Sequence, residues 1–225
     1  MDTGNIASNL ADVRRRIDAA VARAGRAPGS VQLIAVSKTF PPDMVKAAYD
    51  AGQRLFGENR IQEFEARRPE MQWPGATWHF IGHVQSNKAA RAAQLFDMIH
   101  TVDSLALARR LNGLRTTALP VLIEVKLSEE SAKTGAAESE AAMLAVEIRT
   151  MENLDLRGVM TMPPWSMDPE VARPYFQRLR AIGEQLGTKE LSMGMTNDFE
   201  TAIEEGSTMV RVGTAIFGRR EKQKE

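Results

Sequence analysis

Eight short runs of β-forming residues alternate with helical stretches along the chain, and no other feature of the sequence constrains its fold as strongly. The β-like runs span residues 31–36, 54–56, 77–81, 97–102, 121–125, 156–161, 190–193 and 209–212. Helical periodicity occupies segments between them, such as 43–51, 61–68, 104–114, 139–151 and 169–186. Strands that alternate with helices pair in parallel, and eight such units in 225 residues favour a closed (β/α)8 TIM barrel over an open doubly wound sheet.

An amphipathic helix precedes the first strand and is additional to the repeat. Its apolar residues at helical spacing include Ile6, Leu10, Val13 and Ile17. The pattern ends before the Pro28-Gly29 pair, so residues 1–28 form an N-terminal helical segment. No linker rich in proline, glycine or serine divides the chain, which predicts one barrel domain over residues 1–225, with a charged tail at 219–225.

The charge balance excludes a general attraction to nucleic acid or anionic membranes, because Lys plus Arg and Asp plus Glu number 29 each. The chain has no cysteine, which excludes disulfides, thiolate metal sites and a cysteine nucleophile. The N-terminus lacks the apolar core of a secretion signal, and no window approaches the roughly 18 apolar residues that span a bilayer. We therefore expect a cytoplasmic protein with no nucleic-acid or membrane partner.

Functional groups in such a barrel lie at the carboxyl ends of the strands. The distinctive segments there are Ser37-Lys38-Thr39, Gly57-Glu58-Asn59, and residues 78–82, 192–198 and 211–218. The last two have the composition of a phosphate site. Backbone can approach an anion at Gly213, a helix starting nearby would direct N–H groups at it, and Ser192, Thr196 and Thr214 offer hydroxyls. Tight turns and helix caps explain these residues equally well.

Lys38 follows the apolar run 33–36, so its ammonium would project into the barrel mouth, where burying a charge is costly. Desolvation favours the neutral amine, the form that attacks an aldehyde to make a Schiff base. The structural alternative is a lysine that reaches solvent or pairs with Glu58. A lysine and a phosphate cradle on one barrel face together indicate pyridoxal 5′-phosphate (PLP), an aldehyde that carries a phosphate.

Other side chains near the strand ends give weaker signals. His79 and His83 are four residues apart but flank a strand end, so we expect core or loop histidines and no metal site. Tryptophans and methionines either wall an apolar pocket for a ring or pack above the barrel core, and packing is the commoner explanation. They are Trp73, Trp78, Trp165, Met160, Met162, Met193 and Met195.

Several longer blocks occur in a fixed order between about residues 31 and 218. They are Ala35-Val36-Ser37-Lys38, Phe56-Gly57-Glu58-Asn59 with Gln62-Glu63, Trp78-His79-Phe80-Ile81-Gly82 with Gln85-Ser86-Asn87-Lys88, Lys133-Thr134-Gly135, residues 191–196 with Asp198, and residues 210–218. On these blocks the sequence resembles the pyridoxal phosphate homeostasis proteins, also called the YggS or proline synthetase co-transcribed homolog family.

The resemblance implies a barrel of the alanine racemase N-terminal-domain type, with PLP held as a Schiff base on Lys38. It also implies the remaining cofactor contacts: the phosphate on Ser192, Thr196, Gly213 and Thr214, the ring near Asn59, and the pyridine nitrogen facing Arg211. An arginine there discourages protonation of the ring nitrogen and weakens the ring as an electron sink. The family is regarded as buffering or delivering PLP, which implies PLP-dependent apo-enzymes as partners.

Three positions depart from the family pattern. Arg60 replaces a common tyrosine, Lys126 a common asparagine and Thr196 a common serine. Thr196 keeps the hydroxyl, whereas Arg60 and Lys126 add two charges around the predicted mouth.

A racemase also needs a second acid or base on the far face of the cofactor, which alanine racemases supply as a tyrosine from an additional β-domain. The tyrosines here, Tyr49 and Tyr175, fall within predicted outer helices. We therefore predict a non-catalytic PLP carrier for intracellular PLP homeostasis, with no catalytic residues, as a monomer or weak dimer. The alternatives are a PLP-dependent amino-acid racemase and a cofactor-free barrel aldolase or isomerase that uses Lys38 directly.

Overall fold

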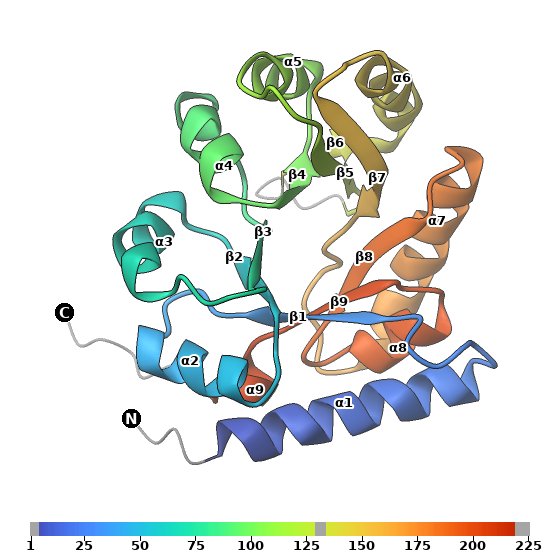
Figure 1. Ribbon diagram of the computed structural model, residues 1–225. Helices are drawn as coiled ribbons and strands as arrows, with labels where there is room; N and C mark the ends of the chain where they lie inside the picture. Colours follow the sequence, from blue (N-terminus) through green and yellow to red (C-terminus); the bar gives the residue numbers. More distant parts are fainter. Residues whose placement is uncertain (1–4, 129–133, 219–225) are drawn as a thin grey trace.

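The computed structural model describes residues 5–128 and 134–218, and in these ranges eight parallel strands close into a barrel (Figure 1). The strands of the ring are β1 (Gln32–Val36), β2 (Leu55–Glu58), β3 (Thr77–Phe80), β4 (Met98–Val102), β5 (Leu119–Lys126), β7 (Leu154–Met160), β8 (Glu190–Met195) and β9 (Met209–Val212). β1 pairs with both β2 and β9, and β4 pairs with β5, so the ring closes. The predicted (β/α)8 barrel is confirmed, and the open sheet is excluded.

Helices surround the ring of strands (Figure 1). They are α1 (Ile6–Arg23), α2 (Pro42–Asp50), α3 (Ile61–Arg67), α4 (Ala89–Leu95), α5 (Leu105–Gly113), α6 (Glu138–Arg149), α7 (Arg173–Gln185), α8 (Phe199–Glu204) and α9 (Thr214–Phe217). Short 3₁₀ turns lie at η1 (Arg68–Glu70), η2 (Ser86–Lys88) and η3 (Pro169–Ala172). A two-residue strand, β6 (Ala136–Ala137), adds to β5 beyond the ring.

The additional helix expected before the first strand is α1, which packs against α2, α8 and α9 (Figure 1). Its buried face carries apolar side chains such as Leu10 and Val13, and burying each is worth roughly 1.5–3 kcal/mol. The predicted tail at 219–225 and the motif residue Lys133 lie outside the described residues. No helix in the described ranges is long and apolar enough to cross a membrane.

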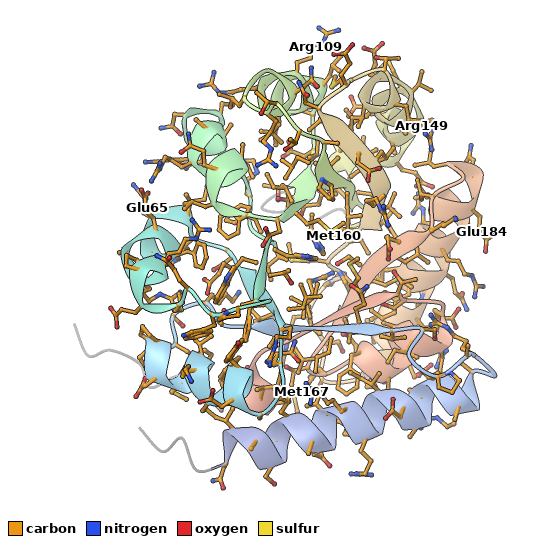
Figure 2. The ribbon with its side chains drawn as sticks, viewed as in Figure 1. Glu65, Arg109, Arg149, Met160, Met167 and Glu184 are labelled. Atoms are coloured by element: carbon orange, nitrogen blue, oxygen red, sulfur yellow. The ribbon has the colours of Figure 1, made fainter. Side chains whose placement is uncertain are left out.

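Apolar side chains fill part of the barrel interior, and the cluster there comprises Ile34, Met98, Leu122, Met160 and Met209. Figure 2 shows Met160 inside the ring, whereas Glu65, Arg109, Arg149 and Glu184 point outward from the surrounding helices. Three strands then carry a buried polar residue two positions nearer their carboxyl end. These residues are His100 after Met98, Glu124 after Leu122, and Arg211 after Met209. Because side chains of a strand alternate between its faces, this polar layer lies between the apolar cluster and the mouth.

Candidate functional site at the barrel mouth

Lys38 is the second residue after β1 and lies half-buried in a tight turn at the carboxyl end of the barrel. The Phe40 amide donates to the Ser37 carbonyl at 3.1 Å, which closes the turn around Lys38 and Thr39. Thr39 has a φ of 67°, a left-handed conformation that costs a β-branched residue of order 1–3 kcal/mol. A strained turn beside a half-buried lysine suits a functional position.

Glu58, at the end of β2, is 0% exposed and contacts the residue before Lys38. One carboxylate oxygen, Oε1, accepts from Ser37 Oγ at 2.6 Å and from Arg67 Nη2 at 3.0 Å. Burial raises the pKa of Glu58, while the Arg67 charge and the Ser37 hydrogen bond oppose that rise. Glu58 therefore contacts both Ser37 and Arg67, and the hydrogen bond to Ser37 ties it to the turn that carries Lys38.

Asn59 follows β2 and is half-buried beside the mouth. Its side-chain oxygen Oδ1 is buried and has no hydrogen-bond partner among the described residues. A buried polar atom without a partner costs free energy, so this oxygen fits a donor from a bound molecule.

A continuous hydrogen-bonded chain crosses the polar layer beneath the mouth. Arg211 Nη1 donates to Ser192 Oγ at 2.7 Å, and its Nη2 donates to the Thr161 carbonyl at 2.9 Å. Ser192 Oγ lies 2.9 Å from His100 Nδ1, and His100 Nε2 lies 2.9 Å from His79 Nδ1. Arginine only donates, so the Ser192 hydroxyl accepts a hydrogen bond from Arg211. It can then donate its own hydrogen bond to His100 Nδ1, and His100 Nε2–H can donate to His79.

Burial controls the charge of this chain. Desolvation lowers the pKa of His79 to about 4 and that of His100 well below its usual value, so both imidazoles are neutral near pH 7. Desolvation also lowers the pKa of Arg211 to about 10, although the charges of Asp198 and Glu124 oppose the shift. Arg211 therefore remains a buried cation at neutral pH.

Ser192 lies deeper than the sequence suggested. β8 continues to Met195, beyond the predicted end at residue 193, with Gly194 at a φ of 94° and a shift of the β9 pairing register between Ser192 and Met195. Ser192 is consequently inside the strand and 0% exposed, with its hydroxyl engaged by Arg211 and His100. The predicted phosphate contact of Ser192 stays a prediction, and its observed contacts hold Arg211 in place.

The segments after β8 and β9 lie at the strand ends where a phosphate cradle was expected. Thr196 is half-buried, and the Met195 amide beside it donates to Asp198 Oδ1 at 2.6 Å. α9 begins at Thr214, as the sequence suggested, with Gly213 at its N-cap and the Thr214 side chain exposed.

The β9–α9 junction is packed against the turn that holds Lys38. A Cβ on Gly213 would lie 3.3 Å from the Val36 carbonyl oxygen, so only glycine lets the backbones approach this closely without adjustment. Phe40 stacks on Phe217 of α9 with ring centroids 4.9 Å apart. The lysine turn and the candidate anion segment are therefore one packed unit.

The weaker candidates are distributed as follows. His79 is a core histidine, whereas His83 is more exposed, with its Nδ1 atom 3.3 Å from Asp103 Oδ2. Within the described ranges no cluster of three or more His, Cys, Asp or Glu residues could hold a metal ion. Arg60 is exposed and pairs with Glu63.

The aromatic and sulfur side chains mostly pack in cores. Trp73 and Trp78 lie with Phe56 in an aromatic cluster between the strands and the helices, and Met193 is buried in the same core. Met160 belongs to the interior cluster, and Met162 packs against it. Trp165 is the exception at 72% exposed.

Sequence reasoning missed His100 and Arg67. The alternation of the predicted strand 97–102 places residue 100 on the same face as residue 98, and this signal could have directed His100 inward. Arg67 gave no comparable signal, because its contacts with Glu58 and Phe40 depend on how α3 packs.

The closed ring of eight parallel strands, with Lys38 just after β1 and the buried Arg211 on β9, places the protein in the class of (β/α)8 barrel domains. The family model described as "Alanine racemase, N-terminal domain" matches residues 2–221. The pyridoxal phosphate homeostasis protein of Escherichia coli (strain K12) is 44% identical over 234 residues, covering 98% of this chain and 99% of that protein. The Pseudomonas aeruginosa protein of the same name is 43% identical, with 96% of each chain covered. The chain belongs to the pyridoxal phosphate homeostasis protein family.

Solved structures agree with this placement. PipY of Synechococcus elongatus PCC7942 without PLP superposes with a TM-score of 0.85 at 37% identity, covering 95% of this chain and 100% of that one. The PipY structure described as having PLP bound gives a TM-score of 0.83 at the same identity and coverage. Alanine racemase from Corynebacterium glutamicum, at 17% identity and a TM-score of 0.70, shares the fold, and the match covers 63% of that chain.

Proposed function

We propose that this chain binds PLP covalently through Lys38 and serves intracellular PLP homeostasis as a cytoplasmic carrier without a dedicated reaction. The names of the relatives and the PLP-bound PipY structure support the cofactor. The observation that carries the proposal for this chain is the packing of the Lys38 turn against the β9–α9 segment, through Phe40 and Phe217. An amine and a candidate anion-binding segment in one packed unit match the two ends of PLP, its reactive aldehyde and its anionic phosphate.

The residues at the mouth fit this cofactor. Thr196, Gly213 and Thr214 would hold its phosphate, with Ser192 as a further predicted contact. Asn59 Oδ1 is a buried acceptor with no partner among the described residues, and Arg211 would face the pyridine nitrogen. When bound, PLP supplies an aldehyde that condenses with a lysine amine and releases water. Because Arg211 is itself held as a cation, it favours an unprotonated ring nitrogen and gives poor support to carbanion chemistry.

The absence of a dedicated reaction is supported by where the tyrosines lie. Tyr49 is in α2, where its hydroxyl donates to the Pro74 carbonyl at 2.8 Å, and Tyr175 is in α7 on the outer ring. His79 and His100 are neutral and occupied in the buried chain beneath the mouth. These residues are poorly placed to exchange a proton on the far face of a bound cofactor. Delivery to PLP-dependent apo-enzymes, by a monomer or weak dimer, is the part of the proposal drawn from the family resemblance.

The test is reduction of the PLP-loaded protein with borohydride, followed by peptide mass spectrometry. We expect one pyridoxyl adduct, on Lys38, which Lys38→Ala removes and Lys46→Ala, a change at a partly exposed lysine of α2, does not. Thr196→Ala with Thr214→Ala should weaken cofactor retention while leaving the adduct on Lys38. An unmodified wild-type protein after incubation with PLP would eliminate the proposal. Solvent deuterium entering alanine at about 1 per second or faster would reject the carrier role in favour of a racemase.

A further inference from the structure

The buried ion pair between Glu58 and Arg67 lies behind the lysine turn, on the side of the helices, and the proposed cofactor chemistry does not use it. Arg67 is 17% exposed and Glu58 1% exposed at their side chains. Within one guanidinium, Nη2 donates to Glu58 Oε1 at 3.0 Å and Nη1 donates to the Phe40 carbonyl at 2.5 Å. Arg67 thus connects the end of β2 to the end of the lysine turn.

The same carboxylate oxygen holds the start of that turn. Ser37 Oγ donates to Glu58 Oε1 at 2.6 Å, and the Ser37 amide donates to the Gly57 carbonyl at 3.0 Å. The two residues between Ser37 and Phe40 are Lys38 and the strained Thr39. Ser37, Glu58, Arg67 and Phe40 therefore form a clip that fixes both ends of a turn whose middle is Lys38.

We infer that this clip, through its Glu58–Arg67 ion pair, positions Lys38 and directs the lysine amine toward the mouth. The inference rests on the proposed function and deepens it, because it assigns two residues to control of covalent attachment. A left-handed threonine reverts to an extended conformation unless neighbouring contacts hold it, and the clip supplies such contacts on each side. The planar guanidinium of arginine presents two donors at a fixed spacing, one to Glu58 and one to Phe40. A lysine at position 67 would keep the charge but could not donate to both groups in this geometry.

The experiment compares wild type with Arg67→Met, Arg67→Lys and Glu58→Gln, each loaded with saturating PLP. Total bound cofactor is measured by equilibrium dialysis, and the rate at which borohydride-reducible attachment to Lys38 appears is measured by quenching and peptide mass spectrometry. Arg26→Met is the matched control, because Arg26 is also a partly buried arginine whose guanidinium bridges two separate groups, the carbonyls of Ile203 and Ser207, away from the lysine turn.

We expect Arg67→Met, Arg67→Lys and Glu58→Gln to bind PLP through its phosphate yet to attach it to Lys38 at least about tenfold more slowly, since small misplacements of a reacting group cost one to two orders of magnitude. Arg26→Met should attach PLP at the wild-type rate despite any loss of stability. Wild-type attachment rates in the Arg67 and Glu58 variants would overturn the inference and leave the proposed function intact. A wild-type protein that never becomes attached at Lys38 would instead overturn the proposed function.

Ser37→Ala keeps the ion pair and removes only the hydroxyl that links Glu58 to the turn. It tests the inference even if loss of the ion pair prevents folding. Slower attachment in Ser37→Ala, at unchanged thermal stability, supports a positioning role. An unchanged attachment rate in this variant contradicts it.

Discussion

Replacing Ser192 by alanine should destabilise the protein far more than the removal of one oxygen atom suggests. The Ser192 hydroxyl is 0% exposed, accepts from Arg211 Nη1 at 2.7 Å and lies 2.9 Å from His100 Nδ1. Loss of a hydrogen bond to a buried charged group costs about 1.5–3 kcal/mol, and an unpaired neutral partner adds about 1 kcal/mol or more. We therefore expect the free energy of unfolding to fall by about 3 kcal/mol, which lowers Tm by roughly 6–12 °C in a chain of this size.

Ser207→Ala is the matched control for this prediction. Ser207 is equally buried, but within the described part of the chain its hydroxyl contacts only backbone carbonyls, those of Leu191, Met193 and Met209. A hydroxyl has one proton to donate, so the change removes one hydrogen bond to neutral groups and should cost about 1 kcal/mol. Urea unfolding followed by circular dichroism, with equal m values for all proteins, measures both free energies.

The comparison refutes the reasoning if the two variants lose the same stability. That result would mean that Arg211 finds another acceptor when Ser192 is truncated, and that the chain from Arg211 to His79 is not a coupled unit. If Ser192→Ala lowers the free energy of unfolding of wild type but not that of the Arg211→Met variant, the cost comes instead from the unpaired guanidinium of Arg211.

Two further predictions concern His79 and Thr39. Burial holds the folded pKa of His79 at about 4, below its unfolded value near 6.5, so unfolding takes up a proton between these two pH values and is favoured as the pH falls. His79→Gln should therefore lose less stability than wild type between pH 7 and pH 5, by about 2 kcal/mol in urea titrations. Equal losses in the two proteins would contradict a neutral buried imidazole. Thr39→Asn should raise the free energy of unfolding by about 1 kcal/mol, since asparagine tolerates a φ of 67° better than threonine, and a lower urea midpoint would show that the Thr39 side chain is itself required.

The sequence could predict the barrel because its signals are local. Each strand is a short apolar run and each helix has its own period, so eight units could be counted without knowing their contacts. The position of Lys38 could be predicted equally well, because a lysine just after a buried strand of a closed barrel lies at the barrel mouth.

The rest of the site depends on partners that no local pattern selects. His100 and Ser192 are 92 residues apart, and they meet because the register of several strands places both in one interior layer. The depth of Ser192 also depends on the irregular pairing at Gly194, which a count of apolar residues does not reveal. Arg67 becomes relevant only once α3 packs beside the turn after β1.

If the proposed function holds, the seam between β1 and β9 also sets when the protein can first hold PLP during synthesis. Lys38 leaves the ribosome before β9, the strand that pairs with β1 on its other side, and before the Phe217 ring that stacks on Phe40. A growing chain that stops short of β9 presents the Lys38 amine without the proposed anion-binding segment beside it. Under the proposed function, capture of the vitamin-derived aldehyde would therefore report that β9 has been translated and that the ring of strands has closed.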